Sequence, residues 1–221
     1  MSSSTPPSPP PAPGFAEALE RHGLVAILRT RRPAAPLLDV VRTLADAGVR
    51  LIEITVPTPG SLAAIRRAAG EFEGAVHLGA GTVTTLDEVA AVHEAGGSFV
   101  VSPHTDPELI RAAGDAALGS LPGALTPTEL LRAHRAGATA VKVFPAARLG
   151  PPYVEDVRGT LPDIPLVPTG GVTAADVPVY RAAGARAVGV GSPLLGDALE
   201  GGSLSELAAR ARHFATVAGA R

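Results

Sequence analysis

Residues 76–102, VHLGAGTVTTLDEVAAVHEAGGSFVVS, contain one complete strand–helix–strand unit. Thr85, with Glu88 three residues later, has the pattern of a helix N-cap and capping box after an apolar run. The residues that follow have a helical period until Gly96, where glycine permits the left-handed conformation that ends a helix. A second β-branched run begins at Phe99. This stretch therefore predicts a parallel α/β unit.

The same alternation of strand and helix recurs along the rest of the chain. The predicted strands are Leu24–Arg29, Arg50–Thr55, Val76–Gly81, Phe99–Ser102, Gly119–Leu121, Ala138–Phe144, Ile164–Pro168 and Ala187–Gly191. The predicted helices lie near residues 34–47, 59–70, 85–95, 106–115, 127–136, 151–160, 174–184 and 204–218. Eight such units after a short helix at 14–22 indicate a single-domain (β/α)8 TIM barrel of the α/β class. An open doubly wound sheet is the alternative, but no Gly-x-Gly-x-x-Gly follows the first strand.

The composition limits the classes of function that remain. A formal net charge of −2 provides no basic field for nucleic acid, and the absence of cysteine excludes thiolate chemistry. No apolar run approaches the roughly 18–20 residues that span a bilayer, so we expect a cytoplasmic protein without a membrane partner. No cluster of His, Asp and Glu has metal-ligand spacing, so neither a metal nor a cofactor is expected. Residues 1–13, rich in Ser and Pro, predict a disordered tail before a folded domain at 14–221.

Lys142 is the only lysine among the nineteen Lys and Arg residues of the chain. Arginine can replace lysine as a surface charge, but only an amine forms an imine with a carbonyl group. The residue also lies in the apolar run Ala140–Pro145, where a charge without a role is unexpected. Lys142 is therefore a candidate nucleophile. A strand-end lysine that faces solvent or pairs with a carboxylate is the alternative.

Further polar residues follow the predicted strands, at the end where a barrel enzyme builds its site. Glu53 interrupts the apolar run Leu51–Val56 and is expected to face the interior, where a carboxylate suits proton transfer. A core carboxylate paired with arginine is the alternative. Thr82 and Arg29 are candidates to bind a substrate carboxylate, arginine through its planar fork. His104 either contacts the substrate or caps the neighbouring helix.

Two glycine-containing turns follow the seventh and eighth predicted strands. They are Pro168–Val172, PTGGV, and Gly191–Pro193, GSP. Many barrels bind a phosphate at this place through backbone N–H groups. Together the turns predict a phosphate site, and two tight turns that simply require glycine are the alternative.

These residues resemble the 2-keto-3-deoxy-6-phosphogluconate (KDPG) aldolase family, which includes the 4-hydroxy-2-oxoglutarate (KHG) aldolases. The resemblance runs from about Leu24 to Leu195. The motifs that carry it are Val25–Arg29, Ile52–Thr55, Gly79–Val83, Ser102-Pro103, Lys142–Ala146, Pro168–Val172 and Gly191-Ser192.

The resemblance implies a homotrimeric class I aldolase without a metal, a lyase of carbohydrate metabolism in the Entner–Doudoroff route. Such an enzyme cleaves KDPG or a related 4-hydroxy-2-oxo acid to pyruvate and an aldehyde, either glyceraldehyde 3-phosphate or glyoxylate. By this resemblance Lys142 forms the Schiff base and Glu53 shuttles protons. The substrate-binding residues that it implies are Arg29, Thr82, Pro103, Phe144, Thr169, Gly170, Gly171, Gly191 and Ser192.

One position departs from the family pattern. Where the family often reads Glu-Val-Thr-Leu-Arg-Thr, this chain reads EITVPT over residues 53–58, so Pro57 replaces an arginine that helps to bind pyruvate. A 2-keto-3-deoxy-6-phosphogalactonate (KDPGal) aldolase, a phosphate-binding isomerase or synthase of the same fold, and a non-catalytic barrel that binds a phosphorylated metabolite remain as alternatives. The hydroxyl of Thr169 favours the gluconate type over the galactonate type.

Overall fold

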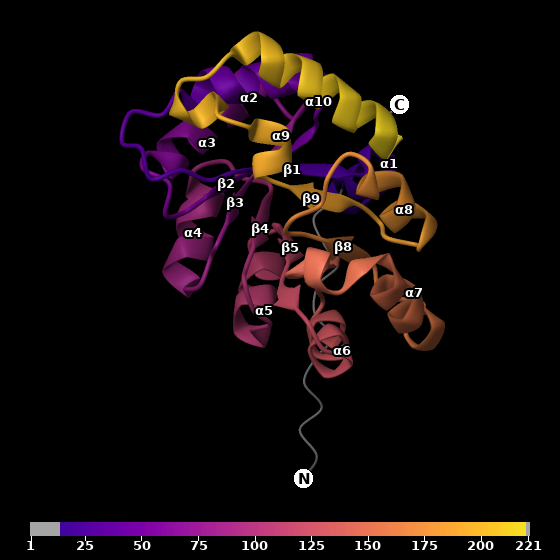
Figure 1. Ribbon diagram of the computed structural model, residues 1–221. Coiled ribbons are helices and arrows are strands. Elements are labelled where there is room, and N and C mark those ends of the chain that lie inside the picture. Colours follow the sequence, from indigo (N-terminus) through magenta and orange to yellow (C-terminus); the bar gives the residue numbers. More distant parts are fainter. Residues whose placement is uncertain (1–13, 220–221) are drawn as a thin grey trace.

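The computed structural model describes residues 14–219, with the strands in the middle of the molecule and the helices around them (Figure 1). The predicted tail at 1–13 lies outside the described residues. The strands are β1 (Leu24–Leu28), β2 (Leu51–Thr55), β3 (His77–Gly81), β4 (Phe99–Val101), β5 (Gly119–Leu121), β6 (Gly123–Ala124), β7 (Val141–Val143), β8 (Leu166–Pro168) and β9 (Val188–Val190).

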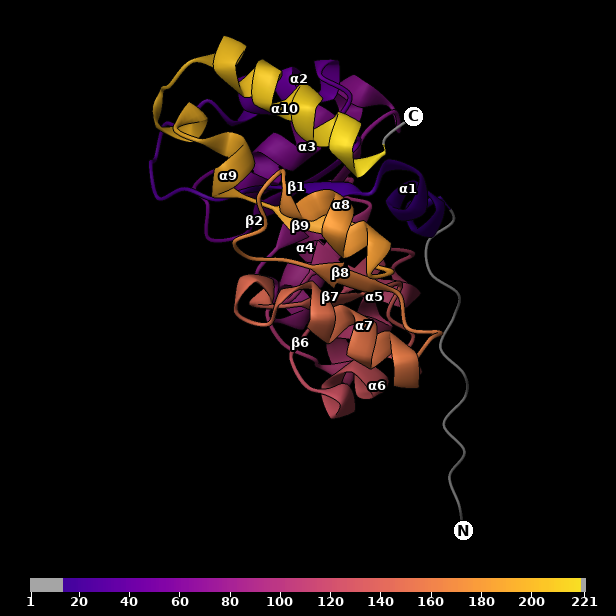
Figure 2. The same cartoon turned by 45° about the vertical axis from the view of Figure 1, so that its right-hand side comes forward.

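The helices are α1 (Phe15–His22), α2 (Leu37–Asp46), α3 (Ser61–Phe72), α4 (Leu86–Glu94), α5 (Pro107–Asp115), α6 (Pro127–Arg135), α7 (Gly150–Thr160), α8 (Asp176–Ala182), α9 (Ser192–Leu195) and α10 (Leu204–Ala218), with 3-10 turns η1 (Ala146–Arg148) and η2 (Ala198–Glu200). Among residues 14–219, helix α1 precedes β1, helices α2 to α8 lie in the connections from β1 to β9, with none between β5 and β6, and helices α9 and α10 follow β9. The last helix, α10, packs against α2 and α8, as the second view also shows (Figure 2).

The strands do not form the closed single-domain (β/α)8 TIM barrel that the sequence predicted. They form two parallel sheets, a six-stranded sheet in the order β5-β4-β3-β2-β1-β9 and a three-stranded sheet in the order β6-β7-β8. Pro122, which has no N–H to donate, separates β5 from β6. Among residues 14–219, no continuous ladder joins β8 to β9; the contacts there are an isolated bridge between Thr169 and Gly189 and a hydrogen bond from the N–H of Arg186 to the carbonyl of Leu166 at 2.8 Å. The number of strand–helix units did not reveal these two interruptions, because pairing between strands depends on segments distant in sequence.

Local sequence signals set the ends of several helices. Thr85 and Thr126 each form the predicted capping box, in which the hydroxyl accepts from the N–H of Glu88 or Glu129 and that glutamate accepts from the cap N–H. Gly96 ends α4 with a φ of 76°, which only glycine adopts without strain. At α4 the chain therefore leaves the helix where the sequence predicted it.

All of the paired strands are parallel, so their carboxyl ends lie at one edge. The amino-terminal side of the interior is closed by α1, whose Phe15 stacks on Phe99 with ring centroids 4.6 Å apart. Gly119 leaves the space that the Phe15 ring occupies, because a side chain there would meet the ring. An apolar plug thus occupies one end of the interior, and polar side chains occupy the other.

Candidate active site

Lys142 lies in β7, and its side chain is buried, with 6% of the residue exposed. Its Nζ lies 5.1 Å from the centroid of the Phe144 ring, within the range of a cation–π contact. Among residues 14–219, Nζ forms no ion pair. The amine therefore faces a cavity instead of pairing with a carboxylate or pointing into solvent.

Glu53 lies in β2 and is only 2% exposed, and its Oε1 has no hydrogen-bond partner in residues 14–219. Burial raises the pKa of the Glu53 carboxyl, and the positive charges of Lys142 and Arg29 oppose this rise only in part. A carboxyl with a raised pKa holds its proton to a higher pH than an ordinary carboxyl, which suits a group that donates a proton to a neighbour. Glu53 is thus electrostatically coupled to Lys142 without a direct ion pair.

Arg29 follows β1 and points toward the carboxyl ends of the strands. One terminal nitrogen of its guanidinium donates a hydrogen bond to Oγ1 of Thr82 at 3.0 Å. Thr82 itself has a φ of 60°, a left-handed conformation that is uncommon for a non-glycine residue. The contact holds the guanidinium in place and leaves its other N–H groups available to an anion.

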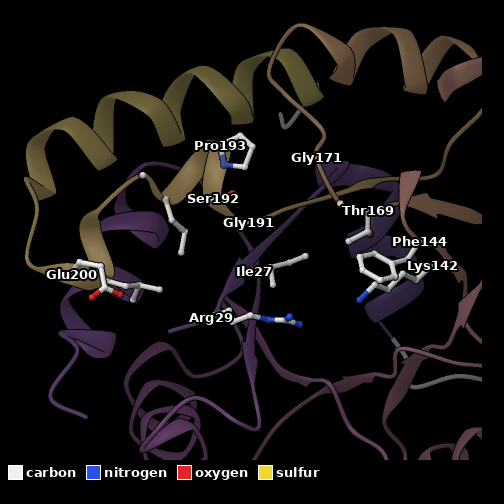
Figure 3. A pocket seen from close by; sticks show the side chains of 14 residues that line it. Ile27, Arg29, Lys142, Phe144, Thr169, Gly171, Gly191, Ser192, Pro193 and Glu200 are labelled. Atoms are coloured by element: carbon white, nitrogen blue, oxygen red, sulfur yellow. The ribbon is translucent and has the colours of Figure 1, made fainter. Parts of the chain in front are cut away.

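A cavity of about 280 Å³ joins these residues to the two glycine-containing turns. Lys142 and Phe144 lie at one end of it, Glu200 lies at the other, and Arg29 lies between them (Figure 3). The residues that line it are Ile27, Arg29, Lys142, Phe144, Thr169, Gly170, Gly171, Gly191, Ser192, Pro193, Leu195, Gly196, Leu199 and Glu200.

The turn after β8 depends on its two glycines. Gly170 and Gly171 have φ values of 95° and 76°, and a side chain on Gly171 would meet Ala147. The Phe144 ring packs directly against Gly170. Among residues 14–219, the N–H groups of Gly171 and Ser192 have no hydrogen-bond acceptor. Gly171 and Ser192 both line the cavity, so these N–H groups can donate to an anion there.

The described residues contain neither a metal cluster nor a membrane helix. No three His, Asp or Glu side chains within 14–219 are grouped to hold a metal ion. None of the helices there is both long enough and apolar enough to cross a bilayer. The chemistry that the site itself offers is a buried amine, a carboxyl with a raised pKa, a guanidinium and backbone donors.

A family model described as KDPG and KHG aldolase matches residues 16–209. The chain belongs to the KDPG and KHG aldolase family. It is a class I aldolase, a carbon–carbon lyase whose chemistry passes through a lysine Schiff base.

Individual members of the KDPG and KHG aldolase family cover most of the chain. A probable 2-dehydro-3-deoxy-6-phosphogalactonate aldolase of Rhizobium meliloti is 36% identical, with 88% of this chain and 90% of the relative aligned. A 2-dehydro-3-deoxy-phosphogluconate aldolase of Pseudomonas aeruginosa is 39% identical over 67% of each chain. A solved structure described as native KDPGal superposes with a TM-score of 0.82 and is 32% identical, with 88% of this chain and 93% of that chain covered.

Most of the residues that the sequence singled out meet at the cavity. Arg29, Lys142, Phe144, Thr169, Gly170, Gly171, Gly191 and Ser192 line it. Glu53 is buried and is not among the lining residues, although the charges of Lys142 and Arg29 act on its carboxyl. Thr82 contacts the site through Arg29. The structure does not bring Pro103 to the cavity, because this residue lies on an exposed turn after β4. His104 is also exposed, and its backbone carbonyl accepts a hydrogen bond from the Ser102 hydroxyl at 2.6 Å.

Sequence reasoning missed the far wall of the cavity. Leu195, Leu199 and Glu200 come from α9 and η2, two short segments between the last strand and the last helix. No cap, repeat or motif marks them in the sequence. The only signal was their place after the eighth strand, which also fits a plain connection.

Proposed function

We propose that this aldolase cleaves a 2-keto-3-deoxy-6-phospho sugar acid, or a related 4-hydroxy-2-oxo acid, to pyruvate and an aldehyde, with Lys142 as the Schiff-base residue. The observation that carries this proposal is that the single lysine of the chain is buried and lines the cavity without an ion pair among residues 14–219. An amine in this state has few roles other than covalent attack.

The reaction follows from the two buried groups. Nζ of Lys142 adds to the C2 carbonyl and water leaves, which gives a protonated imine. Removal of the proton from the C4 hydroxyl breaks the C3–C4 bond, releases the aldehyde and moves the electron pair to the imine nitrogen as an enamine. A proton then adds at C3, and hydrolysis frees pyruvate. In this proposal Glu53 carries these protons, because burial raises the pKa of its carboxyl and so favours the protonated form that a proton donor needs.

The two ends of the substrate have different partners in this proposal. Arg29, held by Thr82, binds the carboxylate beside C2. The turn of Thr169, Gly170 and Gly171, together with Gly191 and Ser192, binds the phosphate through backbone N–H groups and the Ser192 hydroxyl. Phe144 packs beside the imine, where its ring stabilises positive charge.

Borohydride trapping tests the assignment of Lys142. The protein is incubated with pyruvate, reduced and digested, and the Lys142 peptide is expected to gain the mass of a reduced pyruvyl group. The Lys142→Arg variant keeps the charge and is expected to lose the adduct, because a guanidinium does not form an imine. An unmodified Lys142 peptide in the wild-type protein would exclude the proposal, and it would also favour a non-catalytic role or an isomerase.

The KDPGal type is a second candidate, because the relative from Rhizobium meliloti is named for the galactonate substrate. The hydroxyl of Thr169 donates to the carbonyl of Val167 at 3.1 Å, so it is engaged by the strand that precedes it. Its value as evidence for the gluconate type is thereby reduced. The two sugar acids differ in configuration at C4, so kcat/KM measured for both epimers decides between them.

We also propose a homotrimer in the cytoplasm, as the family resemblance implies. Sedimentation equilibrium of the purified full chain tests the assembly, with three times the monomer mass as the expected result. Cell fractionation tests the location.

A further inference from the structure

A row of buried threonine hydroxyls connects the loop after β2 with the loop after β1. Oγ1 of Thr55 and Oγ1 of Thr58 lie 2.9 Å apart in a hydrogen bond, and the N–H of Thr30 donates to Oγ1 of Thr58 at 3.3 Å. All three residues are buried, with exposures of 7% or less. None of them lines the cavity, so the reaction described above does not use them.

The row ends on a carboxylate that does line the cavity. Oγ1 of Thr30 donates to Oε1 of Glu200 at 2.7 Å and accepts from the N–H of Arg32 at 3.0 Å. Thr30 and Glu200 are 170 positions apart in sequence, so this bond fastens η2 to the loop after β1. Both hydrogen-bonding functions of the Thr30 hydroxyl are satisfied, and so is its backbone N–H.

These bonds act on Arg29 through the chain itself. The Thr30 N–H belongs to the peptide group that joins Arg29 to Thr30, so its bond to Thr58 fixes the orientation of that peptide. The bond to Glu200 fixes the side chain of Thr30 and hence the next turn of the loop. The backbone at Arg29 is therefore held by two hydrogen bonds of the next residue. Its guanidinium consequently loses less conformational freedom on binding an anion than it would on an unrestrained loop.

The loop after β2 carries Pro57, which has no charge and no N–H to offer a substrate. Thr58 beside it instead fastens the loop of Arg29. We propose that Thr30, Thr58 and Glu200 are positioning residues that hold Arg29 in the orientation for binding the keto-acid carboxylate. This inference rests on the proposed function, because it requires a carboxylate at Arg29.

The experiment measures the pyruvate concentration that gives half-maximal borohydride trapping on Lys142, together with the thermal midpoint of unfolding. Thr30→Val removes the hydroxyl at nearly constant volume and is expected to raise the half-saturating concentration about tenfold, with maximal trapping unchanged. Thr30→Ser restores the hydroxyl and is expected to restore the wild-type concentration. Glu200→Gln keeps the acceptor and is expected to stay within about twofold, whereas Glu200→Ala is expected to behave like Thr30→Val.

Thr216→Val is the matched control. The Thr216 hydroxyl donates to the backbone carbonyl of Arg212 on α10, away from the cavity, so its loss is expected to leave trapping unchanged. A double-mutant cycle identifies the route of the effect. In an Arg29→Met background, Thr30→Val is expected to change the half-saturating concentration by less than about twofold, because the guanidinium that Thr30 positions is absent.

The outcomes separate the two proposals. If wild-type protein forms no adduct, the proposed function is wrong, and the positioning of Arg29 for that substrate is wrong with it. If wild-type protein forms the adduct while Thr30→Val lowers only the thermal midpoint and saturates at the wild-type concentration, the threonines are structural and only the positioning is overturned. An undiminished effect of Thr30→Val in the Arg29→Met background also overturns it.

Discussion

The carboxylate of Glu53 occupies the space that a side chain on Gly81 would fill. The two residues lie on neighbouring strands, β2 and β3, whose register pairs Thr55 with Gly81. A glycine on one strand therefore makes room for the buried acid of the next. Within the motif Gly79–Val83, Gly81 is therefore required for its missing Cβ atom.

Gly81→Ala is expected to displace Glu53 and to reduce kcat more strongly than it reduces stability. Overpacking of a core costs about 1–3 kcal/mol, which most domains survive. A displaced proton carrier is expected to lower kcat by about 100-fold or more. Kinetics of aldol cleavage beside a urea denaturation curve check both parts, and the control is Gly70→Ala, where no atom lies within 4 Å of the added methyl group. Unchanged kcat in Gly81→Ala would contradict the role of Glu53.

The raised pKa of Glu53 predicts a pH-dependent stability. The folded protein binds a proton at Glu53 more tightly than the unfolded chain does. The stability that this proton contributes is therefore fully present below the pKa of Glu53 in the unfolded chain. It is lost as the pH rises through the folded pKa of the carboxyl. The amide side chain of the Glu53→Gln variant stays neutral at every pH. The thermal midpoint of this variant is therefore expected to exceed that of the wild-type protein by a margin that grows as the pH rises above the pKa of an ordinary carboxyl, on the order of a few degrees. Thermal unfolding measured from about pH 4 to pH 8 gives this margin, because that range brackets ordinary and raised carboxyl pKa values. A margin that shrinks with rising pH would mean that Glu53 is stabilised as a carboxylate.

Ser192→Ala is expected to discriminate between phosphorylated and unphosphorylated substrates. Ser192 lines the same cavity as Gly170 and Gly171. In the close view Ser192 lies apart from Lys142 (Figure 3). Loss of a hydrogen bond to a charged phosphate costs about 1.5–3 kcal/mol, or roughly ten- to 150-fold in kcat/KM. Cleavage of 4-hydroxy-2-oxoglutarate, which has no phosphate, is the internal control and is expected to change by less than about threefold. Equal losses for both substrates would place the phosphate elsewhere.

Thr126→Ala is expected to destabilise the fold without affecting the site. The Thr126 hydroxyl accepts from the N–H of Glu129 at 3.3 Å, and the Glu129 carboxylate accepts from the N–H of Thr126 at 2.8 Å. Removing such a cap costs about 1 kcal/mol. Thr128→Ala in the same helix lacks this capping role and is expected to change stability by less than about 0.5 kcal/mol. Urea denaturation of the two variants compares them directly.

Much of this molecule could be predicted from neighbouring residues in the chain. The capping boxes at Thr85 and Thr126, the glycine that ends α4 and the alternation of strand and helix are local, because each depends on contacts within a few residues. Lys142 was conspicuous for a related reason: a chain that otherwise uses arginine retains one amine, in an apolar strand. The alternation of strand and helix, the candidate nucleophile and the family could therefore be inferred from the sequence.

Tertiary structure alone decided how the strands are joined and what surrounds the amine. The strands form two sheets because the pairing is interrupted at Pro122 and because, among the described residues, no continuous ladder joins β8 to β9. Neither interruption follows from the number of strand–helix units. The bond from Thr30 to Glu200 spans 170 positions and has no local signature. The physical reason is the same in each case: hydrogen bonds and cavity walls between distant segments depend on where the whole chain places those segments, and a pattern of period two or 3.6 carries no information about that.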